Sequence, residues 1–191
     1  MTATSNYLLH WASVPSSISS TVRQDNLFKF TYTLNANNAS SICTSKLLDT
    51  ALWSNFVDAS VADYAIGGPT IEMYAKSWNA KGYSTITPTI ETTGYKVNGD
   101  TYVDMSSNTG FNNNLYYPHN EFTGFNDEEI GSYWLAAPSV EGNENVMVIC
   151  FDGWVDYGSY YSSDVGVRPV IALKEGINAE KDANGIWQLS E

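Results

Sequence analysis

The sequence predicts a single α+β domain in which two helices pack against a mostly antiparallel sheet, followed by a long irregular half. Residues 27–34 alternate apolar and polar side chains, as a half-buried strand does. Residues 46–79 contain two runs of apolar side chains at helical spacing. Residues 132–173 begin and end with apolar runs typical of buried strands. All 191 residues are expected to form one domain, with residues 1–26 as a candidate N-terminal arm.

The N-terminal part contains one clear strand pattern and a shorter apolar run. The inward residues of the predicted strand are Phe28, Phe30, Tyr32 and Leu34. The run at residues 7–11 is interpreted as a first strand or an arm, and the Asn-rich residues 35–40 as a turn.

Two helices are expected next. The first covers residues 46–58, and its apolar face consists of Leu48, Leu52 and Phe56. Gly67 and Gly68 then break the chain, and Pro69 suits the first turn of a second helix that runs to Asn79. Gly82 is a stop signal just beyond it. The buried stripe of the second helix is Ile71, Tyr74, Ala75 and Trp78.

The remaining segments have weaker patterns. Residues 85–103 alternate weakly and predict one or two short strands. Residues 106–125 form a loop that either packs its own aromatic side chains or contributes to a binding rim. Acidic residues 127–129 favour the start of a helical turn. Residues 174–185 are polar, and residues 186–189 are expected to form a last strand.

The segment at residues 132–173 carries the functional argument. Between its apolar ends, Val146, Val148 and Cys150 alternate with the residues beside them, which predicts one strand with two faces. Residues 151–164 then contain Tyr, Trp, Ser, Asp and Gly but no Lys or Arg. Antibody binding loops use this composition, because rigid aromatic rings give contact area and small polar residues give adaptable hydrogen bonds. A solvated loop between two strands is the alternative interpretation.

The two apolar ends, Tyr133–Ser139 (YWLAAPS) and Gly166–Leu173 (GVRPVIAL), resemble the C-terminal half of bacterial and phage proteins with the C-type lectin fold. These include the variable proteins of diversity-generating retroelements, which share their fold with formylglycine-generating enzymes. In the variable proteins, adenines in the template are mutagenised. Asn codons are thereby changed to codons for Tyr, Ser, Asp, Gly and similar residues, in a segment just before the closing strand. Residues 143–164 resemble such a display segment. Mutagenesis of an Asn codon at its adenines does not produce Trp154. Either Trp154 belongs to the fixed scaffold, or this chain is a relative of the variable proteins that is not diversified.

The resemblance implies a scaffold and a contact face. The scaffold would comprise the strands at residues 134–148 and 165–173, with Arg168 buried and paired with a carboxylate. Val146, Val148, Val155 and Gly158 are assigned to the scaffold as well. The expected contact face consists of Asn145, Met147, Ile149, Phe151, Asp152, Trp154, Asp156, Tyr157, Ser159, Tyr160, Tyr161, Ser162, Ser163 and Asp164.

The composition narrows the class of partner. The formal net charge is −12 and the pI is about 4.3, whereas nucleic acids and anionic membranes require a positive surface. No export signal is recognisable, and no apolar run reaches the roughly 18 residues of a membrane span. We expect a protein or cell-surface ligand, and a location on a virion or cell surface rather than in the cytoplasm.

The sequence offers little for catalysis, and no cofactor or metal is expected. His10 and His119 are the only histidines and have no ligand-spaced partners. The Glu-Pro-Asn, Gln-Pro-Asp and Trp-Asn-Asp triplets of calcium-dependent lectins do not occur. Cys43 and Cys150 are interpreted as two free buried thiols or, second, as one disulfide.

The function predicted from the sequence is therefore non-enzymatic binding of a ligand or receptor. Two rival functions stay open. One is a structural or adhesive module of a surface or virion without a diversified site. The other is an enzyme related to formylglycine-generating enzymes, because a fold alone does not fix function.

Overall fold

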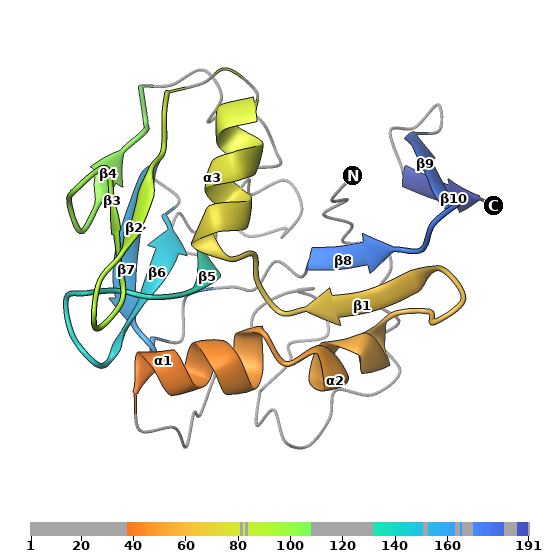
Figure 1. The fold of residues 1–191 in the computed structure, drawn as a ribbon, viewed down its shortest axis with the longest axis horizontal. Coiled ribbons are helices and arrows are strands. Elements are labelled where there is room, and N and C mark those ends of the chain that lie inside the picture. The colour runs from red at the N-terminus through yellow and green to blue at the C-terminus, as the bar shows by residue number, and fades with distance from the viewer. Residues whose placement is uncertain are drawn as a thin grey trace, which may run out of the picture.

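The protein has an α+β fold of mostly antiparallel sheets and two helical segments (Figure 1). The computed structural model describes residues 38–80, 82, 84–107, 132–150, 153–162, 165, 170–181 and 187–190. The α+β class predicted from the sequence is confirmed. The elements predicted at residues 7–11, 27–34 and 127–129 and most of the loop at 106–125 lie outside the described residues, as does Arg168.

A four-stranded antiparallel sheet organises the fold, with the order β4-β7-β6-β5. Its strands are β5 (Tyr133–Pro138), β6 (Asn145–Ile149), β7 (Trp154–Ser159) and β4 (Val103–Asp104). The strands predicted from the apolar run at Tyr133 and from the alternation around Val146 are confirmed.

Strand β7 occupies residues 154–159, so the alternative interpretation of residues 151–164 as a solvated loop does not hold for this part of the segment. Trp154, Val155 and Tyr157 favour extended backbone, and β7 pairs with β6 on one side and β4 on the other. Gly153 makes the tight turn into β7 possible: its φ is +101°, and a Cβ there would lie 2.6 Å from the Ser106 Cα atom.

The first helical segment starts earlier than predicted and is interrupted. It consists of α1 (Ala39–Ile42), a π-helical turn (Cys43–Leu47), α2 (Thr50–Trp53) and a 3₁₀ turn (Ser54–Phe56). One continuous helix over residues 46–58 is therefore wrong. Residues 38–40, predicted as the end of a turn, begin α1 instead, and residues 35–37 lie outside the described residues.

Two polar side chains explain these boundaries. Asn38 accepts a hydrogen bond from the Ser41 N–H at 2.8 Å, so it begins α1 rather than ending a turn. Asp49 accepts one from the Leu52 N–H at 3.0 Å and starts α2 afresh. The buried residues among the described side chains of this segment are consequently Ala39, Cys43, Leu47 and Trp53, while Leu48 and Leu52 are only partly buried.

The second helix, α3 (Ile71–Ala80), matches the prediction closely. Its buried residues are Ile71, Tyr74, Ala75 and Trp78, and Trp78 is completely buried. The Thr70 hydroxyl accepts from the Met73 N–H at 3.2 Å, so Thr70 caps the helix and Pro69 precedes the cap instead of lying in the first turn. Gly82 follows the helix with φ +74°, as a stop residue should.

The two faces of the four-stranded sheet bury two separate hydrophobic clusters. Figure 1 shows α3 above β1 and the α1–α2 segment below it. We call the two clusters the α1 core and the α3 core. The main members of the α1 core are Ala39, Cys43, Leu47, Trp53, Trp134, Val146, Val148 and Ile171. Those of the α3 core are Ile71, Tyr74, Trp78, Leu135, Met147, Ile149 and Val155.

Three smaller antiparallel pairs complete the described chain. They are β1 (Ala62–Ile66) with β8 (Val170–Leu173), β2 (Pro88–Ile90) with β3 (Tyr95–Val97), and β9 (Asn178–Lys181) with β10 (Trp187–Ser190). The short strands predicted within residues 85–103 and the last strand at 186–189 are confirmed, whereas β1 and β9 were not predicted. Among the described residues, no helix combines the length and the hydrophobicity needed to cross a membrane.

Candidate functional site

Strand β6 supports the candidate site and does not belong to its surface. Val146 and Val148 are buried in the α1 core, and Met147 and Ile149 are buried in the α3 core. Assigning Met147 and Ile149 to the contact face was therefore wrong. The side chains of β6 do alternate between two faces, but both faces of this strand are covered.

Strand β7 is covered on one face and only half-covered on the other. Val155 is completely buried in the α3 core, and Tyr157 packs against the same core. Asp156 lies opposite Val148 in the register, so it shares the face of β6 that carries the α1 core. Trp154 and Asp156 are nevertheless half-buried, unlike Val148. Coverage of this face thus decreases from β6 to β7.

Gly158 explains how β7 fits against the covered part of that face. A Cβ at Gly158 would lie 3.4 Å from the Trp134 ring and 3.5 Å from the Val148 side chain. Trp134 is buried and lies opposite Val148 on β5. The indole therefore packs over the C-terminal half of β7, and Asp156 and Trp154 lie toward the N-terminal end of the strand.

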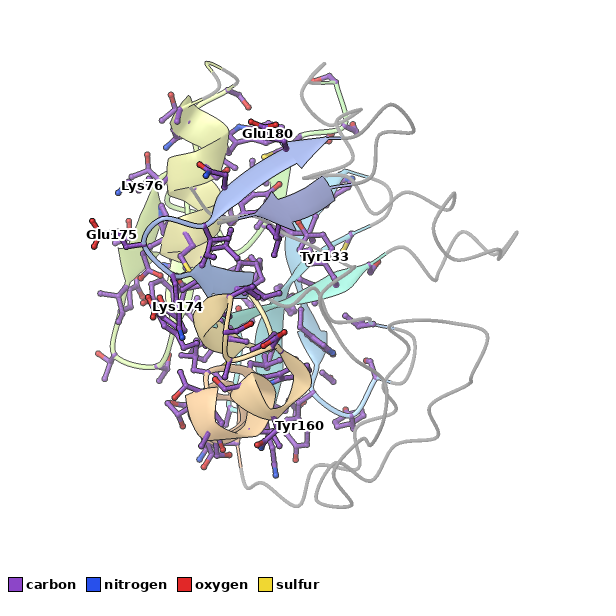
Figure 2. All side chains as sticks on the ribbon, turned by 90° about the vertical axis from the view of Figure 1, so that its right-hand side faces the viewer. Lys76, Tyr133, Tyr160, Lys174, Glu175 and Glu180 are labelled. Atoms are coloured by element: carbon purple, nitrogen blue, oxygen red, sulfur yellow. The ribbon has the colours of Figure 1, made fainter. Side chains whose placement is uncertain are left out.

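The turn after β7 projects one tyrosine outward. The Tyr160 N–H donates to the Glu144 carbonyl at 2.9 Å, and the Ser162 N–H donates to the Ser159 carbonyl at 2.8 Å, so the backbone of the turn is held on both sides. Tyr160 packs against the α1 core, and Figure 2 shows it beside the helices at the bottom of the view. Tyr161 meets Tyr160 edge to face with ring centroids 5.5 Å apart and is 63% exposed.

The predicted contact residues thus separate into distinct groups. Trp154 and Asp156 share one face of β7, Tyr157 lies on the other, and Tyr161 is at the tip of the turn. The expectation of one common exposed face was wrong, because strand geometry sends alternate residues to opposite faces. Asn145 and Ser159 meet across the sheet through their side chains at 3.4 Å, and Ser162 is half-buried. Phe151, Asp152, Ser163 and Asp164 lie outside the described residues.

Two residues that the sequence interpretation missed lie beside Trp154 and Asp156. Asp104 on β4 is the register partner of Trp154. Tyr102 immediately precedes β4, is 46% exposed, and stacks obliquely on Trp154 with ring centroids 5.3 Å apart. The alternation of Tyr102, Val103 and Asp104 was the available signal: Val103 packs against the α3 core, which sends its neighbours to the other face.

The carboxylate of Asp104 is fixed locally. Its Oδ1 atom accepts from both the Ser106 N–H at 2.9 Å and the Ser106 hydroxyl at 2.6 Å. These hydrogen bonds lower the pKa of Asp104, because they stabilise the ionised form. Asp104 is exposed, so its charge remains available to a partner at neutral pH.

The surroundings of Tyr157 are acidic. Its pKa is raised, first by desolvation of the phenol and then by the charges of Glu141 and Asp156. Negative charge around a half-buried phenol opposes its ionisation, so Tyr157 stays a neutral hydrogen-bonding group.

The cysteines do not form a reactive pair. Neither is part of a disulfide: Cys43 is buried and Cys150 is half-buried. Burial raises the pKa of Cys43 from its usual 9.0 to about 12, which keeps the thiol protonated and poorly nucleophilic. Within the described part of the chain, no three His, Cys, Asp or Glu side chains group in a way that would hold a metal ion.

Comparison of the chain with protein-family models, with curated proteins and with solved structures gave no match.

Proposed function

We propose that this protein is a non-enzymatic ligand- or receptor-binding protein that displays an aromatic and polar surface along β7 and the turn that follows. The observation that carries the proposal is the contrast between neighbouring strands. β6 is buried on both faces, while Trp154, Asp156 and Tyr161 on and after β7 keep exposed surface. A firmly packed support with adjacent aromatic side chains is what a binding surface needs.

The chemistry of the site favours binding over catalysis. Cys43 is a protonated, buried thiol, and Tyr157 is held neutral, so neither supplies an activated nucleophile or base. Tyr and Trp give contact area at low entropic cost, and Ser159 and Ser162 supply hydrogen bonds beside them.

The scaffold we propose is a C-type lectin fold, with residues 143–164 as a segment diversified by a retroelement. The motifs at Tyr133–Ser139 and Gly166–Leu173 support this proposal, together with the α+β architecture. In that setting the ligand is a protein or cell-surface molecule, and the protein acts on a virion or cell surface.

Sequencing the DNA beside the gene tests the diversified function. The proposal predicts a reverse transcriptase gene and a template repeat that matches the codons of residues 143–164. Template adenines should fall at codons for outward residues such as Asp156 and Tyr161 and spare those for Met147, Ile149 and Val155. Finding neither gene nor repeat, with identical codons in independent isolates, would leave the structural or adhesive module in its place.

A further inference from the structure

The edge of the four-stranded sheet carries an arrangement of aromatic and acidic side chains that suggests the chemistry of a ligand. Asp104 lies on β4 and Tyr102 immediately precedes that strand, and Trp154 and Asp156 come from β7. Asp104 lies opposite Trp154, and the register continued by one residue sets Tyr102 beside Asp156. We call these four residues the edge patch. In it each aromatic ring faces a carboxylate across the strand pair, and the two rings meet at 5.3 Å.

The edge patch is accessible because the cover of this sheet face ends before it. Val148 and Trp134 on the same face are each only 2% exposed under the α1 core. Asp156 is half-buried one strand farther on, and Tyr102 at the edge is 46% exposed. Side chains that are buried over β5 and β6 thus give way to partly exposed rings and carboxylates over β7 and β4.

The charge of the surrounding chain has one sign. No Lys or Arg occurs between Lys96 and Arg168, a stretch that includes both strands of the patch. Asp104 keeps its negative charge through the two hydrogen bonds from Ser106, which both end on Oδ1 of this exposed residue. A surface of this kind attracts cations and repels anions.

We propose that the edge patch binds an arginine side chain of a protein partner. A guanidinium group is planar, stacks on aromatic faces and donates a fork of hydrogen bonds to carboxylates. The Tyr102 and Trp154 rings supply the faces, and Asp104 and Asp156 supply the carboxylates beside them. This inference rests on the binding function proposed above and assigns the charge class of its ligand.

Titration with a short arginine peptide tests the inference on the full chain. The probe is an acetylated and amidated Gly-Arg-Gly-Arg-Gly peptide, and its matched control replaces both arginines with citrulline, which has the same shape without the charge. Binding is followed by NMR shifts of the β4 and β7 amides and of the Trp154 indole N–H. We expect a Kd of about 1 mM or tighter for the arginine peptide at low salt and at least about tenfold weaker binding of the citrulline peptide.

Four variants separate the patch from general electrostatic attraction. Asp104→Asn keeps an acceptor for Ser106 and removes one charge, and Asp63→Asn removes the same charge from an exposed position on β1. Tyr102→Ala removes a patch ring, and Tyr64→Ala removes a ring of similar exposure on β1 (40% against 46%). The two patch variants should each weaken arginine binding roughly two- to fivefold, while the two β1 variants leave it unchanged.

The outcomes are distinct. Equal binding of the arginine and citrulline peptides, equal losses in the patch and β1 variants, or no binding at millimolar concentrations each overturns the arginine site. Binding of the neutral sugar maltose that is lost in Tyr102→Ala would assign the patch to sugars instead. None of these outcomes decides the proposed binding function. That function is tested separately, by the codons of residues 143–164 and by the folding of variants in the turn after β7.

Discussion

Strands β6 and β7 are neighbours in one sheet and share a register of five residue pairs, yet they face different environments. Every residue of β6 from Val146 to Ile149 is buried, half in each core. In β7 only Val155 is completely buried, and Trp154 and Asp156 remain half-exposed. A strand covered on both faces, such as β6, holds its neighbour in place, so β7 is free to present side chains for recognition.

The largest loss of stability that tests this difference between β6 and β7 is expected at Met147. Met147 is completely buried between the sheet and α3, so Met147→Ala should destabilise the fold by about 2–5 kcal/mol. Chemical denaturation followed by far-UV circular dichroism measures the change. A loss below about 1 kcal/mol would mean that β6 is not the core strand described here.

High pH should lower the stability of the fold through two groups that pack near β6, Cys43 and Tyr95. Cys43 has a pKa raised from 9.0 to about 12 by burial, and Tyr95 one raised from 10.0 to about 12, chiefly by its hydrogen bond to Glu72. Between about pH 9 and 12, both groups stay protonated in the folded chain but ionise in the unfolded chain. The folded state therefore binds more protons than the unfolded state, and the stability of the fold decreases as the pH rises through this range. Thermal unfolding between these pH values should show a falling Tm, and Cys43→Ala should flatten the slope. An unchanged slope in Cys43→Ala would contradict the burial of this thiol.

The turn between β6 and β7 tests how the two strands are joined. Gly153→Ala should destabilise the protein by about 1–3 kcal/mol, because a methyl group there combines a positive φ with a close approach to Ser106. Gly99→Ala is the matched control, since Gly99 has φ +84° but no atom within 4 Å of a built Cβ. Urea denaturation should show the larger loss for Gly153→Ala. Equal losses would mean that the contact with Ser106 contributes nothing.

The smallest effects should distinguish the two tyrosines of the turn. Tyr160 packs against the α1 core, so Tyr160→Ser should cost roughly 1–2 kcal/mol. Tyr161 is 63% exposed, and Tyr161→Ser should change the stability by no more than about ±0.5 kcal/mol. Differential scanning calorimetry of the two variants decides the matter. A larger loss for Tyr161→Ser would show that this ring supports the fold and is not a displayed side chain.

The sequence predicted those parts of the fold in which one local pattern decides the outcome. Helix α3 followed from apolar spacing, and Trp78 is buried as expected. The first helical segment was misplaced because Asn38 and Asp49 each start a helix through a side-chain hydrogen bond, and such caps override apolar spacing. Strand β1 was not predicted, since its burial depends on pairing with the distant β8.

The candidate site was predicted only in part, for a related reason. Composition identified residues 151–164 as a candidate binding segment, but composition does not show how many faces of a strand are covered. Met147 and Ile149 were assigned outward because the helix α3, which buries them, lies far away in the sequence. Tyr102 and Asp104 were missed because only the register of β4 with β7 brings them beside Trp154 and Asp156.

The most direct test of the account compares two libraries made in the same chain. One randomises the outward positions Trp154, Asp156, Tyr161 and Ser162, and the other randomises the inward positions Met147, Ile149 and Val155. Protease resistance on a display host measures the folded fraction of each library. Most outward variants should resist the protease, and few inward variants should. Equal folded fractions in the two libraries would contradict the claim that β7 and its turn display side chains on a core formed by β6.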